Sequence, residues 1–225
     1  MKIFEPERGE SLRMYSLRVL RENIITTEFE PGVMLYEKEI ATALNVSRSP
    51  VREALAELSQ FQLIEILPQR GSRVALIDMD LVNEAVFFRT TMEVAIVKLT
   101  CTMASEKDLS DLEEILKLQE FYLQNFSKDK FMELDNQFHY SLFKICNKLQ
   151  CYNMVSKMGA HFDRIRNLSL HVVKDLKLVQ DHRDIFHAIK DRDPKKAEEM
   201  IRKHLSRIQL DEKEIRKTYP QYFKN

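Results

Sequence analysis

The order of apolar and polar positions between residues 35 and 58 predicts two short helices joined by a tight turn. The first helix has apolar residues three and four apart, which places them on one face. These are Ile40, Ala41 and Leu44. After Asn45-Val46, the run 47–50 offers hydroxyls that can accept from free N–H groups and a proline tolerated in a first helical turn. A second helix is predicted there, with Val51, Ala54, Leu55 and Leu58 as its buried face.

The second predicted helix leaves a cluster of polar residues at its exposed N-terminal end. They are Ser47, Arg48, Ser49 and Arg52, and Lys38 lies on the outer side of the first helix. Donors at such an end can meet phosphates and base edges when the helix enters a major groove. We interpret the pair as a helix-turn-helix that reads DNA. From the pattern alone, an ordinary helical hairpin with polar residues on its solvated side stays open as the alternative.

The sequence changes to a strand-like period after Leu58. Two β-rich runs, 63–67 and 72–77, flank Pro68-Gln69-Arg70-Gly71, which predicts a β-hairpin. Added to helices, this hairpin would form a wing, with Arg70 and Gly71 at its tip near the phosphate backbone. A solvated turn arginine is the alternative role for Arg70.

The helix-turn-helix is preceded by a further predicted helix over about 10–27. Its apolar stripe is Leu12, Tyr15, Val19, Leu20 and Ile24. Pro31-Gly32 is a turn signal, and 33–35 can form a short strand. Residues 1–78 are therefore expected to form a winged helix-turn-helix DNA-binding domain.

From residue 79 onward no strand-like run returns, and an all-α bundle of six helices is predicted. The expected ranges are 80–103, 107–125, 128–148, 151–172, 175–191 and 194–217, with Ser105 as a cap. Successive antiparallel helices with short connections form such bundles. The fold class is therefore mainly α, with the second domain at 79–225. Its core is expected to include Phe131, Leu134, Phe138, Leu142 and Ile145.

The amino-acid composition agrees with a mainly helical fold and indicates the cellular compartment in which the protein is expected. Among 225 residues, 44% are hydrophobic and only four are glycine, which favours a helical protein with a real core. No run approaches the roughly 20 apolar residues that cross a bilayer, and no signal peptide pattern is present, so a cytoplasmic protein is expected. Cys101, Cys146 and Cys151 form no CxxC motif, so buried reduced thiols are expected.

The charge of residues 1–78 limits the expected DNA affinity. This segment carries 10 lysines and arginines against 12 aspartates and glutamates, whereas DNA-binding domains are often strongly basic. Nonspecific affinity should be modest, so binding would depend on a dimer and on the right sequence.

Four metal-ligating residue types are predicted to point into the helical bundle. Asp135 and His139 lie four apart on one helix face, while His182 and His204 share the apolar faces of their helices. One aspartate and three histidines suit a divalent cation such as zinc or nickel with coordination positions left open. For any single histidine, a hydrogen-bonded core imidazole is the more common role, and Asp135 with His139 also suits a simple hydrogen-bonded pair.

Two resemblances cover nearly the whole chain. The run VSRSPVREALAEL, with EKEIATALN before it and Leu63-Ile64 and Arg70-Gly71 after it, resembles the winged-helix domain of the GntR family of bacterial transcription regulators. Residues 79–225 resemble the FCD effector domain of the FadR subfamily, through RTTMEVA, DNQFHYSLF, DHRDIFHAI and IRKHL. The short domain looks more like the VanR branch than the longer acyl-CoA-binding branch.

The FCD resemblance implies functional residues and partners. In many members the aspartate and three histidines of these motifs bind a metal, and all four positions match here. Such regulators typically sense small organic or sugar acids, and Arg89 could pair with a carboxylate. A salt bridge from Arg89 to Glu93 is the alternative. His161, His171 and His187 match no ligand position.

The expected protein is therefore a dimeric regulator that binds a palindromic operator and responds to a small carboxylate metabolite, and it is not an enzyme. An Asp/His₃ site also suits a metal-dependent enzyme, but no separate nucleophile or general base stands near these motifs. A DNA-binding protein whose bundle only dimerises is the third reading. It would leave the inward aspartate and histidines unexplained.

Overall fold

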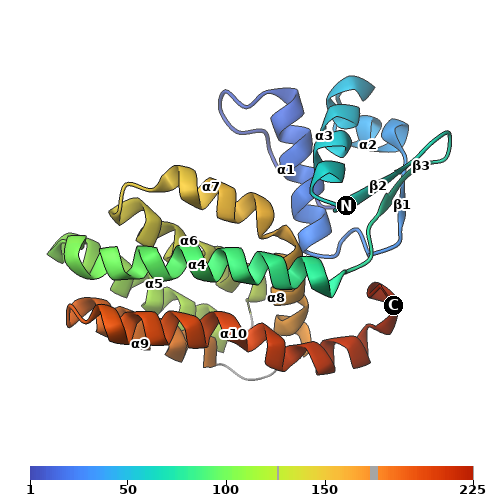
Figure 1. Cartoon of the computed structure of the whole chain (residues 1–225). Coiled ribbons are helices and arrows are strands. Elements are labelled where there is room, and N and C mark those ends of the chain that lie inside the picture. The colour runs from blue at the N-terminus through green and yellow to red at the C-terminus, as the bar shows by residue number, and fades with distance from the viewer. Residues whose placement is uncertain (126, 173–176, 225) are drawn as a thin grey trace. The chain divides into compact units, whose positions relative to one another are not determined.

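The computed structural model (Figure 1) describes residues 1–125, 127–172 and 177–224. The chain splits into two compact units, neither of which is contiguous in sequence. The first unit comprises Met1–Asn83, Ala160–Leu168 and Glu214–Asn225. The second comprises Glu84–Gly159 and Ser169–Lys213. Helices α8 (Ala160–Val172) and α10 (Pro194–Thr218) thus contribute residues to both.

The N-terminal part of the first unit is a winged helix-turn-helix, as predicted. Its helices are α1 (Leu12–Ile25), α2 (Glu37–Ala43) and α3 (Arg48–Gln60). Its strands are β1 (Met34–Leu35), β2 (Ile64–Leu67) and β3 (Gly71–Val74). The expected hairpin is β2–β3, and the expected short strand β1 pairs with β3, so the antiparallel order is β1-β3-β2.

The core of the first unit forms where α1 packs on α3 and α3 packs on β2. The predicted apolar faces of α2 and α3 are buried, as is most of the predicted stripe of α1. Leu12 is the exception at 56% exposure, because it is the first residue of α1. In the turn between α2 and α3, Asn45 adopts a φ of 53°, a left-handed conformation that asparagine tolerates better than most residues.

The predicted hydroxyl capping at the start of α3 is wrong. Ser47 occupies the N-cap position with extended backbone, but its side chain makes no capping hydrogen bond. Ser49 instead donates its hydroxyl to Glu53 Oε1 at 3.1 Å. The hydroxyl of Ser49 is therefore bonded to a carboxylate one helical turn further along α3 and does not cap the helix. The side chain of Ser47 stays exposed.

Within the first unit, two segments from later in the sequence bond to the backbone on either side of the β2–β3 hairpin. His161 donates from Nε2 to the carbonyl of Phe61 at 2.8 Å, and Arg164 donates from Nη2 to the carbonyl of Ala75 at 2.8 Å. At the C-terminus, after the 3₁₀ turn η1 (Pro220–Tyr222), the backbone of Ile77 bonds to Tyr222 and Lys224. The sequence pattern did not predict either attachment.

The helices that follow residue 78 are more numerous than predicted. They are α4 (Met79–Met103), α5 (Glu106–Gln124), α6 (Lys128–Ile145), α7 (Leu149–Met158), α8, α9 (Lys177–Lys190) and α10. In the described ranges there are seven instead of six, because the expected helix 151–172 is interrupted at Gly159. A Cβ at that glycine would lie 2.7 Å from the carbonyl of Val155. The expected start at residue 175 lies outside the described residues.

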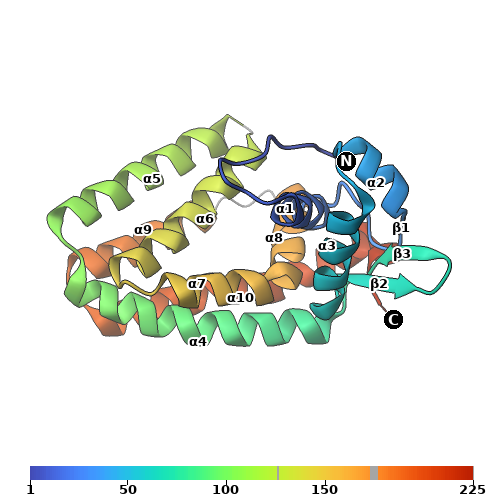
Figure 2. The same ribbon diagram turned by 90° about the horizontal axis from the view of Figure 1, so that it is seen from above.

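The second unit is a helical bundle in which α5 packs against α6 and α9, and α6 packs against α7. Seen from above, α4 and α5 run along opposite sides of this bundle (Figure 2). The predicted cap Ser105 forms a capping box with Asp108 at the start of α5. The expected core residues of α6 are buried except Ile145, which is half-buried at the end of the helix.

Two remaining features concern membranes and thiols. Among the residues that the structure describes, no helix combines the length and apolar character needed to span a bilayer. All three cysteines are free, with Cys101 and Cys146 buried. Cys151 is only half-buried, because it lies in the first turn of α7, so the expectation of buried thiols fails there.

Candidate metal centre and DNA-reading surface

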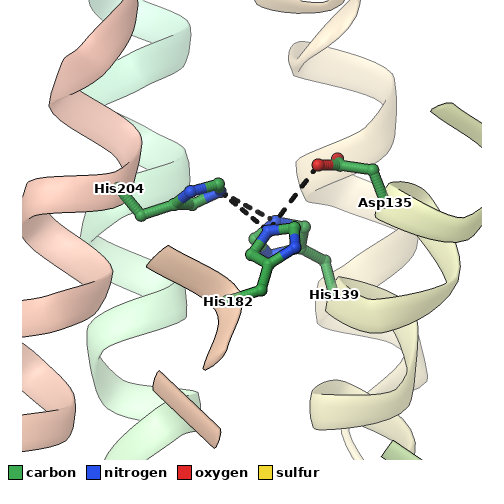
Figure 3. A group of neighbouring side chains, drawn as sticks. All are labelled: Asp135, His139, His182 and His204. Carbon is green, nitrogen blue, oxygen red and sulfur yellow. Dashed lines mark hydrogen bonds and ion pairs between the residues drawn. The ribbon is translucent and has the colours of Figure 1, made fainter. Parts of the chain in front are cut away.

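Four side chains from three helices of the second unit meet in the bundle interior (Figure 3). Asp135 and His139 come from α6, His182 from α9 and His204 from α10. All four are buried, and one ligand atom of each lies within 4.8 Å of the others. The four residues that the sequence singled out are therefore brought to one point.

The distances among the ligand atoms suit a single cation. His204 Nε2 lies 3.2 Å from both His139 Nε2 and His182 Nε2. Nitrogens bound tetrahedrally to one zinc at about 2.0–2.1 Å would be about 3.3–3.4 Å apart. Asp135 Oδ1 lies 3.6 Å from His182 Nε2 and offers a fourth ligand atom.

His139 is oriented by a buried carboxylate from α4. Its Nδ1 lies 2.6 Å from Glu93 Oε2, and Glu93 Oε1 accepts from Arg89 Nε at 2.6 Å. Burial alone would raise the pKa of Glu93, but the charge of Arg89 and the contact with His139 lower it below its usual value. Glu93 is therefore a carboxylate, which assigns the His139 proton to Nδ1 and leaves Nε2 as a bare acceptor.

His182 is oriented in the same way by an amide from α5. Its Nδ1 lies 2.8 Å from Gln119 Oε1, while Gln119 Nε2 donates to the carbonyl of Leu134 at 3.1 Å. Burial lowers the pKa of His182 well below its usual value, so the ring is neutral. The proton is assigned to Nδ1, and a second bare nitrogen points to the centre.

His204 has the loosest outer contact of the three. Its Nδ1 lies 3.9 Å from Asp181 Oδ2, beyond hydrogen-bond distance. Asp181 is itself held by Arg207 and by Lys203, whose Nζ lies 3.3 Å from Oδ1. Burial would raise the pKa of Asp181, but the hydrogen bond from Arg207, the nearby His204 and the charge of Arg207 together lower it below its usual value.

These proton assignments fit a metal ion. The bare nitrogens of His139 and His182 both face His204 Nε2, which carries at most one proton and can satisfy only one of them. The remaining imidazole lone pair finds no donor on the other two rings, and a buried acceptor without a donor is costly. A divalent cation would accept the imidazole lone pairs together with a carboxylate oxygen of Asp135, so this buried group could hold a metal ion.

Arg89 lies beside this centre as part of the Arg89–Glu93–His139 chain. It is buried, and the predicted salt bridge to Glu93 is present. The structure thus displays the alternative that the sequence left open, and a role in ligand binding stays a proposal. The unassigned histidines lie elsewhere: His161 bonds to Phe61 in the first unit, and His171 and His187 are exposed.

The sequence analysis missed the residues that orient the histidines. Glu93 was considered only as a partner of Arg89, Gln119 carried no signal, and Asp181 could have been suspected only as the neighbour of His182. Glu93 and Gln119 contact histidines 46 and 63 positions away, a separation at which a single sequence offers no spacing rule.

The predicted DNA-reading residues lie on the exposed end of α3 and around it. Ser47, Arg48 and Ser49 are exposed in the first turn of α3. Arg52 is one turn further along and pairs with Glu37 of α2, through Nε at 3.0 Å and Nη2 at 2.9 Å. The Nη1 donors of Arg52 are not used in this pair, and its side chain is 69% exposed.

The remaining predicted DNA-binding residues lie on α2 and at the wing. Lys38 and Arg70 are exposed. Gly71 has a φ of 106°, and a Cβ there would lie 3.0 Å from the carbonyl of Leu35. The glycine is therefore required by the local backbone and by close contact with the end of β1. The structure does not test these seven residues as DNA contacts.

Comparison with known families covers both halves of the chain. Residues 18–74 match the bacterial regulatory proteins of the gntR family, and residues 84–207 match the FCD domain. The chain therefore belongs to the GntR family of DNA-binding transcription regulators and carries an FCD domain, as its sequence motifs indicated.

Relatives named as regulators support the same class. The HTH-type transcriptional repressor RspR of Escherichia coli K12 is 35% identical over 207 residues, covering 92% of this chain and 91% of the relative. The gluconate operon transcriptional repressor of Bacillus licheniformis is 29% identical over 145 residues, covering 63% and 59%. The chain is thus a transcription regulator and not an enzyme.

Solved structures support the fold. Escherichia coli McbR/YncC superposes with a TM-score of 0.79 at 17% identity, covering 93% of this chain and 99% of that one. A GntR transcriptional regulator from Rhodococcus sp. RHA1 gives a TM-score of 0.72 at 22% identity, covering 93% and 100%. At these identities, the likeness concerns the fold alone.

Proposed function

We propose that this GntR regulator is controlled by a small carboxylate-bearing metabolite that binds at a divalent metal held by Asp135, His139, His182 and His204. The observation that carries the proposal is the convergence of three imidazole Nε2 atoms and one carboxylate in a buried centre. When bound, the metal would supply a Lewis-acidic position for a ligand oxygen. Zinc or nickel suits this donor set best.

An organic or sugar acid is the effector class that this centre favours. Four protein ligands leave positions open if the metal adopts a coordination number above four, and hard oxygen donors can fill them. Arg89 lies one carboxylate away from His139 and is the proposed effector-pairing cation. The relative that regulates a gluconate operon, by its name, is in line with a sugar-acid effector.

The proposed DNA target is a palindromic operator bound by a homodimer in the cytoplasm, where bacterial DNA lies. Two copies of α3 related by a two-fold axis require matching half-sites. We propose residues 1–78 as the DNA-binding domain and 79–225 as the effector and dimerisation domain. Lys38, Ser47, Arg48, Ser49, Arg52, Arg70 and Gly71 are the proposed DNA contacts.

Metal content and a thermal-shift screen test this proposal. Protein purified without a chelator or histidine tag should contain, or take up, one zinc, nickel or manganese ion per chain. The metal-loaded protein should then gain thermal stability with particular organic or sugar acids, since a ligand that binds only the folded state stabilises it. An Asp135→Asn variant is the control and should lose this gain. No metal uptake by the folded parent would overturn the proposal.

A further inference from the structure

Arg164 on α8 is a buried cation without a carboxylate partner. Its side chain is 0% exposed, and its Nη2 donates to the carbonyl of Ala75 at 2.8 Å. Its Nε and Nη1 atoms have no hydrogen-bond partner among the residues that the structure describes. Burial lowers the pKa of Arg164 to about 10 with no carboxylate to offset the shift, so the guanidinium is still charged at neutral pH. A buried charge without a partner is strongly unfavourable.

The other arginines that are buried in the described part of the chain do have a carboxylate partner. Arg89 Nε lies 2.6 Å from Glu93 Oε1, and Arg166 Nη2 lies 3.4 Å from Asp163 Oδ1. The planar fork of a guanidinium matches the oxygens of a carboxylate or a phosphate. Arg164 therefore lacks an oxyanion that the described residues do not supply.

His161 lies three residues before Arg164 on α8 and offers the opposite kind of group. Residues three apart are neighbours on a helix surface. Burial lowers the pKa of His161, and the charge of Arg164 lowers it further, so the ring is neutral. Because Nε2 donates to the carbonyl of Phe61, Nδ1 is a bare acceptor. This buried Nδ1 also has no hydrogen-bond partner among the described residues.

Both side chains reach the base of the β2–β3 hairpin. The carbonyls to which they bond belong to Phe61 and Ala75, one on each side of the hairpin. The N–H of Ala75 donates to the carbonyl of Leu63 at 3.0 Å, so the two ends of the hairpin lie together. Unused donors of Arg164 and a bare acceptor of His161 are therefore placed at the same end of the wing. A group that accepts hydrogen bonds and also donates one would satisfy both side chains.

We infer that Arg164 and His161 form a binding site for hydrogen phosphate in the first unit, separate from the candidate metal centre of the second unit. The unused N–H groups of Arg164 donate to phosphate oxygens, and the phosphate hydroxyl donates to Nδ1 of His161. Sulfate has a similar size and shape but carries no proton at neutral pH, so it leaves Nδ1 unsatisfied. The site therefore selects phosphate over sulfate. Bound phosphate holds α8 against the base of the wing.

Equilibrium dialysis against radiolabelled inorganic phosphate, in Tris buffer at constant sodium chloride, tests the site. The parent should bind one phosphate per chain, and Arg164→Met should bind none while keeping its helical circular dichroism. Arg192→Met is the matched control and should bind as the parent does, because Arg192 also bonds to backbone carbonyls, at 2.9 and 2.6 Å, but is exposed. A parent that binds no phosphate, or an Arg164→Met protein that binds it as tightly as the parent, would overturn the inference.

A second substitution at Arg164 serves if the methionine variant does not fold. Arg164→Lys keeps the charge but loses the planar fork, so it should bind phosphate about tenfold more weakly or worse. Equal affinity in the folded lysine variant and the parent would also overturn the inference.

Competition with sulfate tests the contact to His161. In the parent, sulfate should displace phosphate only with an affinity about tenfold lower or less, because a buried acceptor that loses its donor is costly. His161→Gln can keep a donor to the carbonyl of Phe61 but removes the Nδ1 acceptor. The two anions should then bind with similar affinity. An unchanged preference for phosphate in this variant would show that His161 does not recognise the phosphate hydroxyl.

The variant His182→Ala separates this site from the metal centre, where a bound metal could itself take up phosphate. This variant loses a candidate metal ligand of the second unit and should still bind phosphate at Arg164. If phosphate uptake is lost in His182→Ala and kept in Arg164→Met, the anion is a metal ligand and the inference fails while the proposed function stands. If the parent takes up no metal but binds phosphate through Arg164, the proposed function fails and the phosphate site stands.

Discussion

Glu93 Oε2 lies 2.6 Å from Nδ1 of His139, and both side chains are only 1% exposed. Because Glu93 is also held by Arg89, it fixes the ring of His139 with Nε2 directed at the candidate metal centre. Partners of this kind raise the basicity of a ligating imidazole, and their loss typically costs 10–100-fold in metal affinity.

Glu93→Gln should therefore weaken metal binding about 10- to 100-fold while leaving the bundle folded. The amide of glutamine keeps the size of the side chain, but its oxygen is a weaker hydrogen-bond acceptor than a carboxylate. The substitution also leaves the charge of Arg89 without its carboxylate partner. Competition with a chromogenic chelator measures the affinity. Glu113→Gln, at an exposed ion pair on α5, is the matched control and should bind metal as the parent does. Equal affinity in both variants would show that Glu93 does not position His139.

The pair formed by Arg52 and Glu37 leads to a prediction about DNA reading. Glu37 occupies the Nε side of the guanidinium and leaves the Nη1 donors free for a guanine edge. Arg52→Ala should weaken binding to an operator duplex that the parent protein selects from a random-sequence pool by about 1–3 kcal/mol. It should also relax the base preference of the protein. Arg13→Ala removes an exposed arginine paired with Glu57 and is the control. If fluorescence anisotropy gives the two variants the same affinity, α3 does not read DNA through Arg52.

The glycines offer a test of the wing. Gly71→Ala should destabilise the protein by about 1–3 kcal/mol, because alanine is strained at a φ of 106° and its Cβ would crowd the carbonyl of Leu35. Gly9 has a φ of 82°, but a Cβ there would have no neighbouring atom within 4 Å. Gly9→Ala therefore introduces backbone strain without a steric clash. Urea unfolding should rank Gly71→Ala as the less stable variant. The reverse order would contradict the described packing of β3 on β1.

A pH prediction follows from Glu10 and Arg18. The hydrogen bond from Arg18 lowers the pKa of Glu10 from 4.5 to about 2. A carboxylate with a lowered folded-state pKa stabilises the protein above pH 4.5, and this contribution is lost as the pH falls toward 2. The urea midpoints of the parent and Glu10→Gln should differ at pH 6 and approach each other between pH 4.5 and 3. A difference that does not depend on pH would contradict the ion pair.

The local elements of this fold were predictable because their signals are local. The helix faces at Ile40 and Leu55, the hairpin around Arg70 and the cap at Ser105 each follow from spacing within one turn or one strand pair. The break at Gly159 was missed because the apolar pattern continues through it. A single glycine is tolerated in many helices, and the clash that would follow from a Cβ is visible only in three dimensions.

The metal centre was predictable only in part. The ligand positions on α6, α9 and α10 follow from helical spacing together with the family motifs. The partners Glu93 and Gln119 come from two other helices, and only the packing of the bundle brings them to the rings. The same holds for His161 and Arg164, which bond to carbonyls beside the wing from a helix far along the sequence.

The coupling of the metal centre to DNA binding is the central claim of this account. The most direct measurement is the affinity for the selected operator with and without the acid found in the thermal-shift screen. In the metal-loaded parent the acid should change the affinity, because it binds the DNA-competent and DNA-incompetent states unequally. In His182→Ala, folded and free of metal, the acid should have no effect. An unchanged response in that variant would contradict the claim.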